Sequence, residues 1–311
     1  MKQTGARGRG QGAREKSNNA SDQKGSALII TLLLITVLTG LVVNFVYEVY
    51  IDSSSLSNWG NAQKASLIAK SGQVIGTEFI REIKKETYTY IREVELPVTQ
   101  DFGPGVSLSI VIEDENSRFN INSLIRDDGL TENTEAIASL KNMLEYLNIN
   151  TNLALSIADW IDIDSEPRLH NSEDLAKNDF LWSIDELRLI EGVTKDVFDK
   201  MSPYITAYKD SSTAIPQINI NTAEIPVLMG IHSGISEITA KNIIEHRKVA
   251  PFEQEGSIGD VPGMQGLAIY DRIDVKPTIF KVTSTATVNE ITRIIESVID
   301  SNSKIQFWRE G

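Results

Sequence analysis

Carboxylates gather in one short segment of the sequence. Asp159, Asp162 and Asp164 lie within six residues, and Glu173 follows them. Hard cations such as Ca²⁺ bind several carboxylate and carbonyl oxygens supplied by a flexible loop. With Asp162 as the first position, Asp164 and Glu173 fall at the third and twelfth positions of an EF-hand loop. The sixth position, where that loop has glycine, is Pro167, so the segment fits either another kind of calcium site or a solvated acidic loop that caps helices.

The sequence holds no set of residues typical of an enzyme active site. It has no cysteine, which excludes disulfides and thiolate chemistry. The three histidines, His170, His232 and His246, are far apart and lack metal-ligand spacing. Neither a Gly-x-Ser-x-Gly elbow nor a phosphate-binding loop is present. We therefore expect a protein that is not an enzyme.

Two segments share one pattern. Residues 119–124 read Phe-Asn-Ile-Asn-Ser-Leu, and residues 218–223 read Ile-Asn-Ile-Asn-Thr-Ala. Asn and Thr side chains accept hydrogen bonds from the free amides at helix N-termini, so the pattern predicts a repeated strand-to-helix cap. After the second copy, the segment around Gly234 and Arg247 resembles helix-hairpin-helix units, which bind DNA phosphates. Ser236 replaces the second hairpin glycine and acidic residues surround it, which weakens a DNA-binding interpretation.

An apolar segment runs from Ser26 to Tyr47 without a charge. As a helix it would be roughly 33 Å long, enough to cross the hydrocarbon core of a membrane. Residues 1–25 hold six of the 30 basic residues but only two of the 43 acidic ones. Their composition predicts disorder, and their charge predicts a cytoplasmic N-terminus with the acidic remainder across the membrane. An acidic body is a poor ligand for nucleic acid.

Hydrophobic periodicity predicts the fold class. A stripe at helical spacing continues the apolar segment as a helix through residues 48–95: Ala65, Ile68, Gly72, Ile75, Phe79 and Ile83. Alternation predicts strands at 106–112, 280–287 and 291–299, with a short edge at 305–308. The intervening residues read as helical. We expect an α+β fold in which the long helix packs on an antiparallel sheet, built from 96–122 and 278–311, with a helical domain inserted at 123–277.

The residues before the apolar segment resemble a type IV prepilin site. Lys24, Gly25 and Ser26 directly precede the apolar residues, the reverse of an ordinary signal peptide. The resemblance implies that prepilin peptidase cuts between Gly25 and Ser26, removes the leader 1–25 and leaves a methylated Ser26. An uncleaved signal anchor is the alternative. Most pilins carry Glu at the fifth mature position, which here is Ile30; the K-type minor pseudopilins of type II secretion lack this Glu.

The order of motifs also resembles the K-type minor pseudopilins, the general secretion pathway protein K family. The motifs are Asp114-Glu115 followed by Asn120-Ile121-Asn122, the Asp-Trp-Ile-Asp-Ile-Asp segment at 159–164, and the second Asn motif at 219–223. The resemblance covers nearly the whole mature chain. It implies a pilin-like fold with an inserted domain that is SAM-like or helix-hairpin-helix-like. It also implies calcium, with Asp159, Asp162, Asp164 and Glu173 as ligands.

The resemblance carries functional expectations. It implies a single-pass protein of the bacterial inner membrane with a periplasmic C-terminal domain, which primes the pseudopilus of type II secretion from its tip. The implied partners are the I- and J-type minor pseudopilins, the major pseudopilin, prepilin peptidase and the inner-membrane assembly platform. The apolar stem would pack against them, so a charge at Leu33 should block assembly whereas Glu at Ile30 should do little or be poorly tolerated. A membrane-anchored DNA-uptake protein is the alternative.

Overall fold

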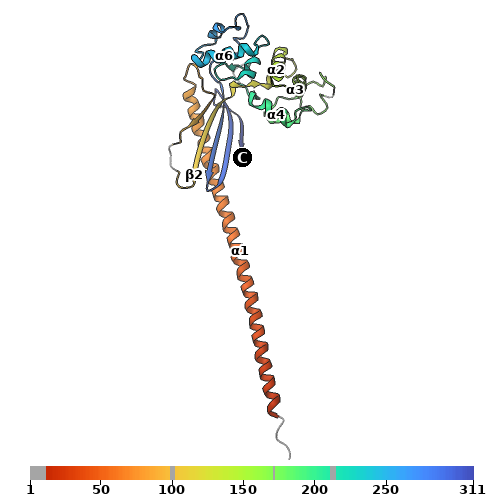
Figure 1. The fold of residues 1–311 in the computed structure, drawn as a ribbon, viewed down its shortest axis with the longest axis vertical. Coiled ribbons are helices and arrows are strands. Elements are labelled where there is room, and N and C mark those ends of the chain that lie inside the picture. The colour runs from red at the N-terminus through yellow and green to blue at the C-terminus, as the bar shows by residue number, and fades with distance from the viewer. Residues whose placement is uncertain (1–11, 99–101, 171, 211–214) are drawn as a thin grey trace, which may run out of the picture. The chain divides into compact units, whose positions relative to one another are not determined.

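The computed structural model describes residues 12–98, 102–170, 172–210 and 215–311, with side chains from residue 25 onward. The first eleven residues of the expected leader lie outside the described residues. The chain divides into two units, residues 1–61 and 62–311. The helix α1 (Gly12–Ile83) begins in the first unit and ends in the second. Figure 1 shows the strands and the inserted helices that complete the second unit.

The described residues of the first unit, 12–61, form the N-terminal part of α1. This part is long and apolar enough to cross a membrane, and its apolar side chains are exposed, as a lipid-facing helix requires. Its threonine hydroxyls are satisfied within the helix: Thr31, Thr36 and Thr39 each donate to a backbone carbonyl three or four residues earlier. The disorder expected throughout residues 1–25 is wrong from Gly12 onward, because extending an existing helix costs far less than nucleating one.

The second unit contains a five-stranded antiparallel sheet. Its strands run in the order β1 (Glu93–Leu96), β2 (Val106–Asp114), β7 (Ile279–Val288), β8 (Ile291–Asp300) and β9 (Ile305–Glu310). The strands predicted from alternation are confirmed, with ends shifted by a few residues. Asn289 and Glu290 have positive φ angles in the two-residue turn between β7 and β8, as the common hairpin turn requires.

The expected continuation of α1 to residue 95 is wrong. The helix ends at Ile83. The edge strand β1 (Glu93–Leu96) takes residues 93–95, which were expected in the helix, together with Leu96, which was expected in the sheet. The lysines and glutamate after Ile83 are good helix formers, so the helical propensity of the segment outlasts the apolar stripe. Once that stripe ends, little apolar surface is left to hold a further turn against the sheet, and packing rather than propensity sets the boundary.

The part of α1 in the second unit packs closely on the sheet. Ala65, Ala69 and Ile80 are buried against it. Gly72 and Gly76 occupy the same face, where the backbones come nearest. A Cβ atom at Gly76 would lie 2.6 Å from Cγ1 of Val282, and one at Gly72 would collide with Oγ of Ser284. The approach of helix to sheet therefore depends on glycine at both positions.

A helical domain is inserted between β2 and β7, as predicted, and occupies more than half of the chain. It begins directly after β2, so residues 115–122, which were expected in the sheet, belong to the insertion, because residues 119–120 pair with residues 205–206 and not with a strand of the sheet. Its first lobe, residues 119–206, contains α2 (Thr134–Tyr146), α3 (Leu153–Ile161) and α4 (Lys195–Met201), with the 3₁₀ helices η2 (Ile121–Leu124), η3 (Ile184–Leu189) and η4 (Ser202–Tyr204). Its second lobe, residues 218–274, contains α5 (Ile225–Met229), α6 (Glu237–Val249) and η5 (Glu255–Asp260). One hydrophobic core runs through both lobes.

Each lobe is closed by a short parallel strand pair that starts at an Asn motif. In the first lobe β3 (Phe119–Asn120) pairs with β4 (Ile205–Thr206). In the second lobe β5 (Ile218–Asn219) pairs with β6 (Ile273–Asp274). The first asparagine of each motif accepts a hydrogen bond from the amide two residues later, at 2.9 Å and 3.0 Å. The predicted strand-to-helix cap is confirmed for the first copy, where Asn120 caps η2. It is wrong for the second copy, where Asn219 closes a turn and α5 begins after Glu224 without a side-chain cap.

The second asparagine of each motif ties distant segments together. In the first lobe Nδ2 of Asn122 donates to the carbonyls of Leu181 and Ala207, and Oδ1 accepts from the Leu181 amide, all at 2.9 Å. In the second lobe Asn221 repeats this arrangement with the carbonyls of Phe252 and Val275 and the amide of Phe252. Each lobe is therefore braced by the side-chain amide of one asparagine, which is part-buried in the first lobe and buried in the second.

The insertion enters and leaves the sheet at one place. The 3₁₀ helix η1 (Glu115–Ser117) follows β2 directly. Within it, Oδ1 of Asn116 accepts from the amides of Thr278 and Ile279, both at 2.9 Å, where the chain returns to β7. The neighbouring Asp114 is fully buried, and its Oδ2 accepts from Nδ2 of Asn219 at 2.8 Å. Burial raises the pKa of Asp114 to about 6, so a titratable group joins the sheet to the second lobe.

Candidate functional site

Three of the predicted carboxylates meet in the first lobe. Asp159 lies in the last turn of α3, Asp162 follows that helix directly, and Glu173 comes from the loop beyond it. Asp159 and Asp162 are both completely buried. One oxygen from each of the three residues lies within 4.8 Å of the others. Because hard cations prefer such carboxylate oxygens, this group is the candidate metal centre.

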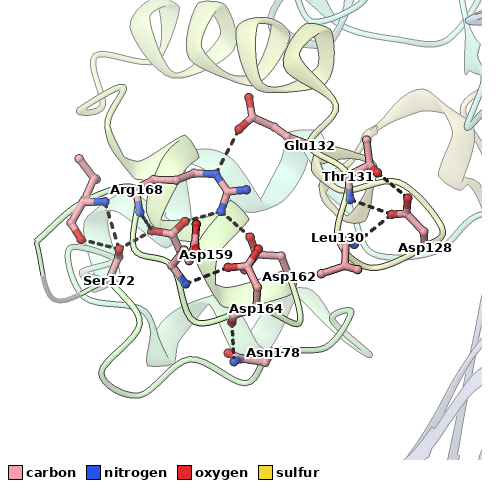
Figure 2. Close-up of polar contacts among 12 residues, drawn as sticks. Asp128, Leu130, Thr131, Glu132, Asp159, Asp162, Asp164, Arg168, Ser172 and Asn178 are labelled. Atoms are coloured by element: carbon pink, nitrogen blue, oxygen red, sulfur yellow. Dashed lines mark hydrogen bonds and ion pairs between the residues drawn. The ribbon is translucent and has the colours of Figure 1, made fainter.

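Arg168 pairs with two of the three members of this group. Nη1 of Arg168 donates to both Oδ1 of Asp159 and Oδ2 of Asp162, as Figure 2 shows. The Arg168 backbone amide also donates to Oδ2 of Asp159 at 2.9 Å, and Nε reaches Oε2 of Glu132 at 3.2 Å. The guanidinium therefore supplies the positive charge that two buried carboxylates need. The hydroxyl of Ser172 completes the shell of Asp159.

Some carboxylate oxygens of this group have no hydrogen-bond donor among the described residues. Within the described parts of the chain, neither carboxylate oxygen of Glu173 has a hydrogen-bond donor, and both are screened from solvent. Oδ1 of Asp162 also has no donor there. Burial, and then the charges of Asp162 and Asp159, raises the pKa of Glu173 to about 7. One arginine does not neutralise the group, and unpartnered oxygens of this kind can ligate a cation.

The fourth predicted ligand, Asp164, is not in this group. Its Oδ1 accepts from the amide of Glu166 at 2.8 Å, and its carbonyl accepts from Nδ2 of Asn178 at 2.9 Å. Asp164 therefore shapes the loop beside the three carboxylates (Figure 2). Arg168 and Glu132 were missed from the sequence. A basic residue between acidic ones was the only signal for Arg168, and Glu132 lies too far away in the sequence to be paired with it.

The other predicted site residues lie on the first unit. Gly25 and Ser26, the expected processing site, are exposed on α1. Ile30 and Leu33, the expected assembly positions, are also exposed, by 62% and 63%. These side chains cover the outside of an apolar helix, the surface that meets lipid or another apolar helix.

In the hairpin around Gly234 in the second lobe, polar groups make hydrogen bonds within the protein. The amide of Gly234 donates to Nδ1 of His232 at 2.8 Å, and the hydroxyl of Ser236 caps α6 by accepting from the amide of Thr239. Nη1 of Arg247 donates to the carbonyl of Ile220 at 2.6 Å. A phosphate would need free amides and free cations here. In this hairpin those named groups are already engaged inside the protein.

Comparison with known proteins separates the two lobes. The family model described as "Type II secretion system (T2SS), protein K" matches residues 117–210, which is the first lobe with its flanks. A helix-hairpin-helix motif matches residues 213–271. Type II secretion system protein K of Pseudomonas aeruginosa is 24% identical over 257 residues, covering 75% of each chain. The protein K of Aeromonas hydrophila is 21% identical over 310 residues, covering 89% of this chain and 92% of its own.

The chain belongs to the type II secretion protein K family. A solved structure agrees on the fold: a chain of the GspK-GspI-GspJ complex from the enterotoxigenic Escherichia coli type 2 secretion system gives a TM-score of 0.63 at 17% identity. The match covers 84% of this chain and 99% of that one. The expected family and fold class are both confirmed. As a protein K, the chain is a minor pseudopilin, a structural component of a secretion machine.

Proposed function

We propose that this protein K stands at the tip of the type II secretion pseudopilus, where it primes assembly and supports protein export across the outer membrane. The observation that carries the proposal is Ile30 on the exposed face of an apolar helix. In pilin-like filaments, a glutamate at this place meets a neighbouring subunit. A subunit that cannot make this contact fits the position where one neighbour is absent.

The size of the insertion also supports a position at the tip of the pseudopilus. The insertion is larger than the sheet that carries it, and it leaves the sheet between two paired strands. A subunit of a packed shaft is surrounded by copies, so an added domain of this size would have to fit beside every one of them. A tip subunit meets no such limit. We therefore infer that the insertion faces the periplasm, with the N-terminus of the chain in the cytoplasm.

The solved relative is a complex of three proteins, GspK, GspI and GspJ. This supports I- and J-type minor pseudopilins as partners of this chain. The proposal extends to the major pseudopilin, the inner-membrane assembly platform and prepilin peptidase. Peptidase-dependent cleavage between Gly25 and Ser26 would leave a mature, methylated N-terminus at Ser26. The intact mass of the membrane-extracted protein, with and without the peptidase, tests this step.

Secretion in cells that lack the native protein tests the function. Leu33→Asp places a carboxylate in the middle of the apolar stem, where a charge is expensive. It is expected to abolish secretion and pseudopilus formation, whereas Leu33→Ile, which keeps the stem apolar, is expected to restore both. Membrane fractions must hold equal amounts of the two variants. Normal secretion by Leu33→Asp would contradict the stem as an assembly surface.

We also propose that Asp159, Asp162 and Glu173 hold a calcium ion. The residues fit it, because the oxygens of Glu173 and Oδ1 of Asp162 are buried, have no donor among the described residues and are hard ligands. Asp164 adds negative charge beside them. Bound calcium would link the end of α3 to the following loop. It is expected to raise the thermal unfolding midpoint. Glu173→Gln should remove this effect, whereas Asp174→Asn, which changes an exposed neighbour, should keep it.

The helix-hairpin-helix match favours DNA binding as a second candidate. The contacts of Gly234, Ser236 and Arg247 count against it, since each is engaged within the second lobe. If this hairpin bound DNA, the protein would bind labelled duplex DNA at low salt. The Lys241→Glu variant, which reverses an exposed charge, would not bind it. We expect no retention by the full-length protein.

A further inference from the structure

Arg168 lies where a cation would be held. Its guanidinium bridges Asp159 and Asp162 through a single nitrogen atom, and these two carboxylates are completely buried. The same two residues, with Glu173, form the group proposed to hold calcium. A divalent ion and the guanidinium cannot both take the oxygens that face Nη1.

The carboxylates are not satisfied by the arginine alone. Oδ1 of the fully buried Asp162 and both oxygens of Glu173 lack a donor within the described parts of the chain. These oxygens are available to a cation, whereas both oxygens of Asp159, the third member of the group, are engaged by Arg168 and Ser172. Glu173, the residue without any donor, is also the one that Arg168 does not contact.

We propose that Arg168 is a built-in competitor that sets the calcium affinity of this site. It stabilises the calcium-free lobe by pairing with Asp159 and Asp162, and it must release Oδ1 of Asp159 when the ion enters. The inference rests on the proposed calcium site.

The Arg168 side chain has an alternative partner close by. Nε of Arg168 already contacts Oε2 of Glu132, which is part of the loop before α2 and is half-exposed. The backbone amide of Arg168 holds Asp159 independently of the side chain. The guanidinium can therefore rotate toward Glu132 while the loop keeps its attachment to α3.

Calcium titration of the full-length protein in detergent, by calorimetry, tests the competition. Arg168→Met removes the charge and keeps most of the side-chain length. It is expected to bind calcium at least about tenfold more tightly than the unmodified protein, because no cation has to be displaced. Without calcium this variant is expected to unfold at a lower temperature, since two buried carboxylates lose their partner, and calcium should reverse that loss.

Arg118→Met is the matched control. Arg118 is also mostly buried and also pairs with two carboxylates, those of Glu113 and Glu115, but it has no contact with the candidate metal centre. The control should lose stability without calcium and show neither tighter calcium binding nor recovery. Should Arg168→Met not fold, Arg168→Lys replaces it; one ammonium group makes a poorer bridge than the guanidinium, so calcium should again bind more tightly.

The outcomes separate the two proposals. Tighter binding by the Arg168 variant alone supports the competition. Equal or weaker binding by that variant, with calcium still bound, overturns the role of Arg168 and leaves the calcium site standing. Absence of binding in both the unmodified protein and the variant overturns both proposals, because removing the competitor would then expose no site.

Discussion

Gly72→Ala is the sharpest test of how α1 meets the sheet. Alanine is about 1 kcal/mol better than glycine in a helix interior, so a helix without close neighbours would gain from the change. At Gly72, however, the new Cβ would fall on Oγ of Ser284 and lie 2.9 Å from Cδ1 of Leu108. Forcing an extra carbon into a packed interior costs about 1–3 kcal/mol.

The balance is a net loss of up to about 2 kcal/mol in the free energy of unfolding. Gly60 is the matched control, because it lies on the same helix with nothing within 4 Å of its Cβ position. Gly60→Ala is expected to leave stability unchanged or raise it by up to about 1 kcal/mol. Urea unfolding of the full-length protein in detergent, followed by near-ultraviolet circular dichroism, measures both.

A second substitution isolates the cause. The hydroxyl of Ser284 is fully buried without a hydrogen-bond partner among the described residues, so Ser284→Ala is expected to cost little. It removes the atom that the new methyl group meets. The double variant Gly72→Ala/Ser284→Ala should recover about 1–2 kcal/mol of the loss. A Gly72→Ala protein as stable as Gly60→Ala, or strictly additive effects, would refute the close-approach argument.

Two further predictions concern the insertion. Burial raises the pKa of Asp114 to about 6 from a usual 3.8. The protonated carboxyl therefore contributes stability that is fully present well below pH 3.8 and is lost as the pH rises through 6. Relative to Asp114→Asn, the unmodified protein should lose about 2 kcal/mol in the free energy of unfolding between pH 4 and pH 7, as measured by urea titrations. Asn221→Ala removes the brace on Phe252 and Val275 and should cost about 2–4 kcal/mol, whereas removing the exposed amide of Asn242 should cost far less.

Local hydrophobic patterns in the sequence predicted most of the fold. The alternation of Val106, Leu108 and Ile110 placed β2 correctly because one face of that strand is buried and the period is visible in the sequence. The helical stripe of α1 was equally clear. Gly72 had been counted as a member of that stripe. Only the structure shows why it is glycine, since Ser284 comes from a strand more than two hundred residues later.

The candidate metal centre was predictable as a set of acids and not as a geometry. Asp159 and Asp162 lie three residues apart at the end of one helix, so local spacing brought them together. Arg168 reads as part of a solvated loop until its contacts are known. The sequence did not predict the asparagine braces for the same reason. A cap is a local contact, whereas the partners of Asn122 lie 59 and 85 residues away in the sequence.

The single point at which the insertion enters and leaves the sheet has a consequence for folding kinetics. Strands β2 and β7 are neighbours, yet the whole insertion separates them in the sequence. Closing so long a loop while it is unfolded carries a large entropic cost and slows the search for the native pairing. Once the insertion has folded, Asn116 binds the amides of Thr278 and Ile279 and keeps the two ends of the insertion close together. The folded insertion then connects β2 to β7 as a short turn would. The helical domain is therefore expected to fold first and to nucleate the sheet.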